Sequence, residues 1–136
     1  MYLAIDPGKT TGYAMFDDSG VVTFMGKIEG EDEFLDQLEE LVASQNIKVA
    51  VVEEYRNRPN MKHNLRSTNV TSQHIGAITR ILRKAKIKIV IQPASPCLSV
   101  GLKFLGVSEN YINKHVPDDV SALAHGTYYL RKQKIL

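Results

Sequence analysis

The N-terminal stretch, residues 1–16, constrains the fold most, because it places a single carboxylate between two predicted strands. Residues 2–5 form a short apolar run typical of a buried strand, and Pro7-Gly8 ends that strand. A second strand is predicted at residues 10–16, with Gly12 where a side chain would crowd the turn. Asp6 therefore lies at the tip of a strand, a position that suits a metal ligand. An ordinary Asp-Pro-Gly turn is the alternative interpretation.

Length and composition limit the class of protein. A chain of 136 residues, 43% of them hydrophobic, is long enough for one globular domain, residues 1–136, and too short for two. It has no apolar run near the roughly 20 residues of a membrane span and no signal-peptide layout, so we expect a cytoplasmic protein with no membrane partner. Cys97 is the only cysteine, which excludes an intrachain disulfide and a thiolate zinc cluster.

The net charge of +2 hides a strong division of charge along the chain. Residues 1–54 contain 3 Lys or Arg and 12 Asp or Glu, whereas residues 55–136 contain 14 and 3. The second part is therefore a candidate surface for a polyanion such as nucleic acid. Basic side chains that merely solvate helix surfaces are the alternative.

The remaining pattern predicts an α/β fold. The turn residues 17–20 and an alternating run at 21–27 indicate a third, antiparallel strand. Compact apolar runs at residues 47–52 and 87–91 are typical of strands buried in a parallel sheet. Helices are predicted at residues 31–44, 68–86, 95–106 and 118–132, with a short helical piece from Ser108. This order predicts a mixed five-stranded sheet, three antiparallel then two parallel strands, with helices on both faces.

Carboxylates recur at the ends of these elements. Asp6 ends the first strand, Glu53 ends the fourth, and Asp118 and Asp119 open the last helix. If the first and fourth strands are parallel neighbours, Asp6 and Glu53 lie at the same edge of the sheet. Carboxylates that close raise one another's pKa unless a cation lies between them. Oxygen ligands of this kind suit Mg²⁺ or Mn²⁺, and two such ions can act on a phosphodiester.

Three motifs carry a resemblance to a known family. They are Asp6-Pro-Gly-x-x-x-Gly12, the strand Val49-Ala-Val-Val-Glu-Glu-Tyr55, and His115-Val-Pro-Asp-Asp-Val-Ser-Ala-Leu-Ala-His-Gly126. Together they resemble the RuvC-like Holliday-junction resolvases of the RNase H-like superfamily, and the short chain looks most like the bacteriophage branch. The resemblance implies an RNase H-like fold and a homodimeric endonuclease that cuts four-way DNA junctions, in a bacterial cell or a phage-infected host. It also implies that the catalytic residues, which hold Mg²⁺ or its substitute Mn²⁺, are Asp6, Glu53, Asp118 and Asp119.

The third motif leaves its ligand assignments open. Aligning the Ala-Leu-Ala run with the family pattern places Asp118 first and Ser121 second. Aligning His115-x-x-Asp118 instead makes Asp118 the second position, so Asp118 is a ligand in both alignments. Asp119 either adds a carboxylate or stabilises the helix N-terminus. A non-catalytic nucleic-acid-binding module of the same fold is the alternative function.

Three other polar residues flank these positions. Alternation along the strand sends Glu54 to the face opposite Glu53, which favours Glu53 as the ligand. His125 lies seven residues after Asp118 on the same helix face, and we expect it to pack or bridge instead of binding metal directly. His115, beside the same helix, is a candidate to assist proton transfer or to position water.

The basic second part supplies the predicted DNA contacts and dimer helix. The expected DNA-binding residues are Lys9, Arg56, Arg58, Lys62, Arg66, Arg80, Arg83 and Lys84. Cutting two strands of one junction needs two acid clusters related by a two-fold axis, so we expect a homodimer. In the resembling family the helix after the catalytic strand forms the dimer contact, and its apolar stripe here is Ile75, Ile78 and Leu82. The alternative is that this stripe covers the sheet.

Overall fold

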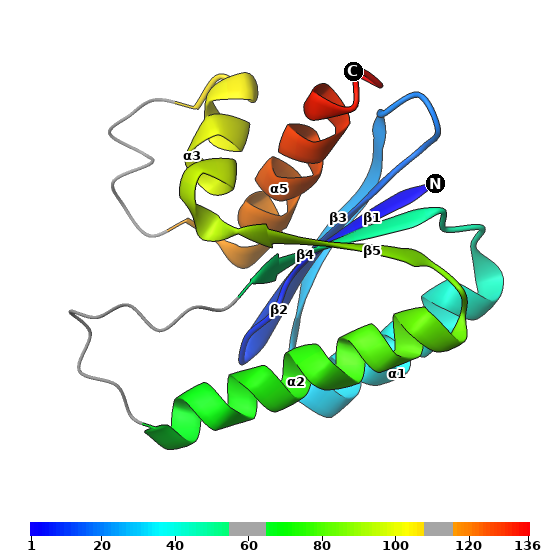
Figure 1. The fold of residues 1–136 in the computed structure, drawn as a ribbon, viewed down its shortest axis with the longest axis vertical. Helices are drawn as coiled ribbons and strands as arrows, with labels where there is room; N and C mark the ends of the chain where they lie inside the picture. The colour runs from blue at the N-terminus through cyan, green and yellow to red at the C-terminus, as the bar shows by residue number, and fades with distance from the viewer. Residues whose placement is uncertain (55–64, 108–115) are drawn as a thin grey trace.

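The computed structural model describes residues 1–54, 65–107 and 116–136, and it shows an α/β fold (Figure 1). The strands are β1 (Tyr2–Asp6), β2 (Thr10–Phe16), β3 (Val22–Glu29), β4 (Val49–Glu54) and β5 (Lys88–Pro93). The helices are α1 (Glu31–Ser44), α2 (Leu65–Lys84), α3 (Ala94–Phe104) and α5 (Asp118–Lys132). Among the described residues, no helix combines the length and apolar character that crossing a membrane requires.

The strands of the described part form a five-stranded sheet in the order β3-β2-β1-β4-β5. β1 pairs antiparallel with β2, and β2 pairs antiparallel with β3. β4 pairs in parallel with both β1 and β5. The predicted mixed sheet is therefore confirmed. β1 and β4 are central because their apolar runs are buried on both faces of the sheet.

Alternating side chains give the sheet a core on each face, with α1 and α2 on one side and α3 and α5 on the other (Figure 1). The core under α1 and α2 includes Ile5, Val52, Phe34 and Ile78. The core under α5 includes Ala4, Val51, Ala122 and Leu130. Because the alternation continues to the strand ends, Asp6 and Glu53 face α5, whereas Glu54 belongs to the opposite face.

Some boundaries differ from those predicted. β4 begins at Val49 instead of Ile47, and its pairing with β5 continues through Glu53 to Glu54 and Pro93. α2 begins at Leu65, before the predicted start at residue 68. The prediction missed this first turn because its polar residues show no apolar periodicity. Ser95 in α3 has an extended backbone, with φ −105° and ψ 129°, so the regular helix begins at the following proline. The helical piece expected from Ser108 lies outside the described residues.

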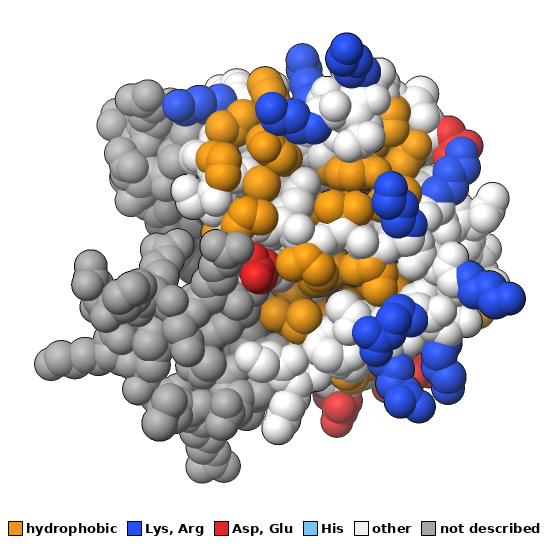
Figure 2. Space-filling model, in the orientation of Figure 1, with side chains coloured by type: hydrophobic (Ala, Val, Ile, Leu, Met, Phe, Trp, Pro, Cys, Tyr) orange, Lys and Arg blue, Asp and Glu red, His pale blue; other side chains and the backbone are white. Residues whose placement is uncertain are grey.

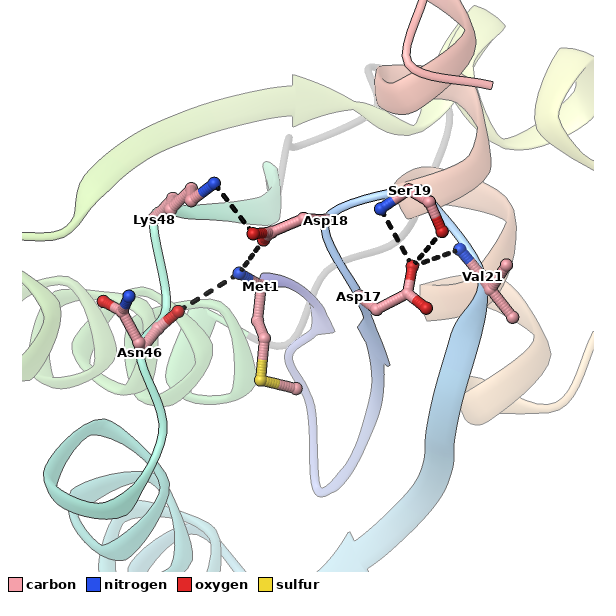
Figure 3. Close-up of polar contacts among 7 residues, drawn as sticks. All are labelled: Met1, Asp17, Asp18, Ser19, Val21, Asn46 and Lys48. Atoms are coloured by element: carbon pink, nitrogen blue, oxygen red, sulfur yellow. Dashed lines mark hydrogen bonds and ion pairs between the residues drawn. The ribbon is translucent and has the colours of Figure 1, made fainter.

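Polar contacts close the end of the sheet where β1 begins (Figure 3). The predicted turn is present, and Asp17 Oδ1 accepts hydrogen bonds from the N–H and the hydroxyl of Ser19, at 2.9 and 2.7 Å. Asp18 pairs with the amino group of Met1 at 2.6 Å and with Nζ of Lys48 at 3.1 Å. Exposed ion pairs of this kind contribute little to stability, so we assign them only a local role at the start of β1 and β4.

Candidate active site

Asp6 and Glu53 lie side by side at the ends of neighbouring strands. The parallel pairing of β1 with β4 sets Ile5 opposite Val52, so the next residue on each strand reaches the same edge of the sheet. Both side chains face α5, and their carboxyl groups share a hydrogen bond. The structure thus brings the two acids together as expected, while their catalytic and metal-binding roles stay predictions.

The pKa values of the two carboxyl groups shift in opposite directions. Burial, the charge and hydrogen bond of Glu53 and the charge of Asp118 together raise the pKa of Asp6 to about 9, and burial is the largest of these causes. A hydrogen bond from Ser121 opposes it. Burial also raises the pKa of Glu53, but the contacts of its carboxylate with His125 and Asp6 outweigh that effect and hold the pKa below its usual value. At neutral pH the pair therefore holds one proton between its two carboxyl groups.

The N-terminus of α5 brings a third carboxylate to this pair through close contact with β2. Gly12 is the register partner of Asp6 across the β1–β2 pair. A Cβ atom at Gly12 would lie 1.9 Å from the carbonyl oxygen of Asp118 and 2.6 Å from the backbone nitrogen of Asp119. Glycine lets the helix backbone lie directly on the strand, which holds Asp118 within electrostatic reach of Asp6. The crowding expected at Gly12 therefore comes from α5 and not from the turn.

The first turn of α5 also directs Ser121 toward the acids. The buried Ser121 hydroxyl donates a hydrogen bond to Oε2 of Glu53 at 3.4 Å and hydrogen-bonds to Asp6. Asp119 Oδ1 instead accepts the backbone N–H of Val120 at 3.0 Å. Of Ser121 and Asp119, Ser121 is the one whose contacts lie with the acid pair. Asp119 contacts its own helix terminus, and its metal-binding role stays a prediction.

Gln92 and His125 complete the described surroundings of Glu53. The buried ring of His125 places Nε2 3.2 Å from Oε2 of Glu53. Gln92 is paired with Glu53 across β4 and β5, and its Nε2 lies 3.1 Å from both Nδ1 and the carbonyl oxygen of His125. The expectation that His125 packs or bridges is confirmed. The sequence analysis did not predict Gln92 as a site residue. Its place in the site follows from its strand register with Glu53, which the sequence alone does not reveal.

A second buried histidine supports the turn that follows Asp6. Thr11 Oγ1 donates a hydrogen bond to the carbonyl oxygen of Gly8 at 3.2 Å and lies 3.0 Å from Nε2 of His74 in α2. Burial lowers the pKa of His74, and the acids at the start of α1 oppose this only in part. α2 is thereby attached to the turn from the face opposite α5.

The predicted DNA-binding residues divide by what the structure describes. The exposed ones, after β1 and near the end of α2, are Lys9, Arg80, Arg83 and Lys84. Arg56, Arg58 and Lys62 lie outside the described residues, as does the side chain of Arg66. His115, the candidate for proton transfer, also lies outside them. Figure 2 shows Lys and Arg side chains more often than acidic ones on the face formed by α2, β5 and α3. DNA binding by these residues stays a prediction.

The predicted dimer stripe is largely buried inside one chain. Ile78 and Leu82 have 0% exposure and pack in the core under α1 and α2. Ile75 is partly buried. The assignment of Ile78 and Leu82 to a dimer interface is therefore wrong, and the alternative that they cover the sheet holds. Their helical spacing is that of any core-facing stripe, which the sequence cannot distinguish from an interface.

The donor set at this edge of the sheet suits a divalent cation. Two carboxyl groups in contact, one of them protonated, with a third acid within electrostatic reach, form a place where a dication can replace the proton. Within the described residues, no three His, Cys, Asp or Glu side chains are already grouped as metal ligands. The acids that could supply oxygen ligands to such an ion are Asp6, Glu53 and Asp118, and the binding of Mg²⁺ or any other ion here stays a prediction.

Solved structures assign the fold. Thermus thermophilus RuvC in complex with a Holliday junction substrate matches with a TM-score of 0.70 at 13% identity, over 96% of this chain and 94% of that one. The chain has the RuvC fold. The yeast mitochondrial Holliday junction resolvase Ydc2 matches with a TM-score of 0.66 at 14% identity, over 98% and 79%. The fowlpox virus resolvase in complex with its Holliday junction DNA gives 0.61 at 13%, over 97% and 99%.

At identities of 13% and 14%, the likeness to RuvC and these resolvases establishes the fold and leaves the activity open. No protein-family model matches the sequence, and no curated protein matches it. The predicted resemblance to the RuvC-like fold is thus confirmed by the arrangement of strands and helices. The chemistry of the site rests on the side chains described above.

Proposed function

We propose that this chain is a divalent-metal-dependent endonuclease that resolves four-way DNA junctions. The observation that carries the proposal is the buried Asp6–Glu53 pair, with Asp118 beside it, at one edge of a RuvC-fold sheet. Two structures of that fold, from Thermus thermophilus and fowlpox virus, are complexes with Holliday junctions. The basic second part of the sequence adds support, because a phosphate backbone attracts such a surface.

Each side chain of the site has its own part in this activity. A divalent cation, when bound, supplies positive charge that stabilises the phosphodiester transition state and activates water. Asp6, with its proton lost to solvent, and Asp118, from the start of α5, would supply carboxylate oxygens to that ion. Ser121 and His125 contact Oε2 of Glu53 and orient that side chain. The burial of these acids strengthens their electrostatic interactions, because the local dielectric is low.

The active species in this proposal is a homodimer. A four-way junction must be cut on two strands, and the described part of the chain brings together one acid cluster. Two copies related by a two-fold axis supply the second cluster. Because Ile78 and Leu82 belong to the core, the contact between copies has to use other residues.

Cleavage of a synthetic four-way junction in the presence of Mg²⁺ tests the activity. We expect Asp6→Asn, Glu53→Gln and Asp118→Asn each to abolish cleavage and to leave junction binding nearly intact, because they remove ligands without changing shape. Asp36→Asn makes the same chemical change at an exposed position of α1 and should cut normally. Full activity of Asp6→Asn would reject this site. A wild-type protein that binds the junction without cutting it would instead indicate the non-catalytic module.

A further inference from the structure

The contacts of Gln92 fix the orientation of its amide group. Its Nε2 lies 3.1 Å from the backbone carbonyl oxygen of His125, an atom that can only accept a hydrogen bond. An amide nitrogen only donates and an amide oxygen only accepts. The opposite orientation of Gln92 would set two acceptors against each other in a buried place, so the amide nitrogen is the atom that faces His125.

The same nitrogen fixes the tautomer of His125. Nε2 of Gln92 also lies 3.1 Å from Nδ1 of the ring. Because that nitrogen presents only hydrogens, Nδ1 must carry none and act as the acceptor. The ring hydrogen is therefore on Nε2, which lies 3.2 Å from Oε2 of Glu53.

Nε2–H of His125 is a buried donor aimed at the acid pair. The ring has 0% exposure, and its N–H is not aligned well enough for a full hydrogen bond to any described acceptor. A buried donor without an acceptor raises the free energy of the folded state. Conformers of Glu53 that turn a carboxylate oxygen toward the ring are therefore favoured. Ser121 donates to the same oxygen from the preceding turn of α5.

We propose that Gln92 and His125 are positioning residues that act on the reaction through Glu53. Gln92 holds the ring in the Nε2–H tautomer, and the ring in turn holds Oε2 of Glu53. A nitrogen that carries a hydrogen has no lone pair for a metal, so this tautomer gives His125 an orienting role and not a ligand role. The effect on cleavage presupposes the nuclease activity proposed above, whereas the tautomer and its effect on metal binding do not.

The tautomer is measured directly on the wild-type protein. Imidazole ¹⁵N chemical shifts and couplings, recorded without metal, should show Nδ1 without hydrogen and Nε2 with it. Gln92→Met keeps a similar volume but removes the donor, and it should give a mixture of tautomers. A ring with hydrogen on Nδ1 in the wild type would overturn the proposal, whatever the enzyme cuts.

Two substitutions of His125 separate positioning from packing. His125→Gln keeps an N–H donor near the place of Nε2, whereas His125→Leu fills the space without any donor. We expect His125→Leu to lower both Mn²⁺ affinity and the cleavage rate by about 10–100-fold, the range typical of residues that orient metal ligands. His125→Gln should recover most of each loss. Thr127→Val is the matched control, because it alters another buried polar residue of α5, and it should match the wild type.

The outcomes separate this proposal from the proposed function. Equal losses in His125→Leu and His125→Gln would show a packing role and overturn the proposal, as would wild-type Mn²⁺ affinity in His125→Leu. A wild type that cuts no junction would reject the nuclease activity, and Mn²⁺ titration with the ¹⁵N spectra would still decide whether His125 positions Glu53. If His125→Leu does not fold, the wild-type and Gln92→Met spectra decide.

Discussion

Replacing Gly12 by alanine tests whether the contact between β2 and α5 sets the geometry of the acids. The new Cβ atom would lie 1.9 Å from the carbonyl oxygen of Asp118 and 2.1 Å from its carbonyl carbon. Backbone atoms cannot rotate away as a side chain can. α5 must therefore move by roughly 1.5 Å to restore an ordinary contact distance of about 3.4 Å.

This displacement should reduce both stability and activity. Overpacking of a close contact typically costs about 1–3 kcal/mol in the free energy of unfolding. A misplacement of about 1 Å in a catalytic group lowers rates by about 10²-fold. Gly12→Ala should show both losses, because Asp118 and Ser121 move with α5 away from Asp6 and Glu53.

Urea denaturation measures the stability of Gly12→Ala, and single-turnover cleavage of a four-way junction measures its activity. Gly76→Ala is the matched control, because a Cβ atom at that exposed position of α2 meets no atom within 4 Å. Alanine in a helix should stabilise the control by about 0.5–1 kcal/mol and leave its cleavage rate unchanged. A Gly12→Ala protein as stable and as active as the wild type would refute the reasoning.

Measurements against pH, against salt and of stoichiometry each test a different part of the proposal. Without metal, the free energy of unfolding should fall as pH rises from about 4 to about 9, because folded Asp6 keeps its proton to about 9 and the unfolded side chain loses it near 3.8. Asp6→Asn should remove this slope in urea titrations with EDTA. Alanine at Arg80, Arg83 and Lys84 should lower the slope of log affinity against log salt by about 0.9 for each phosphate that these side chains neutralise, and an unchanged slope places the DNA elsewhere. Sedimentation should find two copies on each junction, whereas a single copy that cuts both strands would contradict the homodimer.

The sequence was sufficient for those parts of the fold that depend on local patterns. The apolar run before Asp6 and the one before Glu53 mark the two central strands, and the order of elements makes these strands parallel neighbours. Their acids then meet because parallel strands end at the same edge. The helix opened by Asp118 was also predicted with its observed bounds, because a proline and two acids mark its start.

Contacts between distant segments could not be read from the sequence. An apolar helical stripe looks the same whether it covers a sheet or a partner, so the burial of Ile78 came from the structure alone. The contact of Gly12 with α5 depends on the packing of a helix more than one hundred residues away in the chain. The place of Gln92 beside Glu53 depends on the register of β4 with β5. The residues next to Gln92 in the sequence do not indicate that it contacts the site.

These distant contacts shift the pKa values of the two acids in opposite directions. Asp6 and Glu53 are both buried, and burial by itself raises the pKa of each. The difference arises because the contact from His125 is made to Glu53, whereas Asp6 faces two other acids with only Ser121 as a described side-chain donor. α5 therefore does more than deliver Asp118. Its first two turns lower the pKa of Glu53 through Ser121 and His125 and add the charge of Asp118 that raises the pKa of Asp6. This asymmetry depends on the glycine that lets the helix lie against the strand.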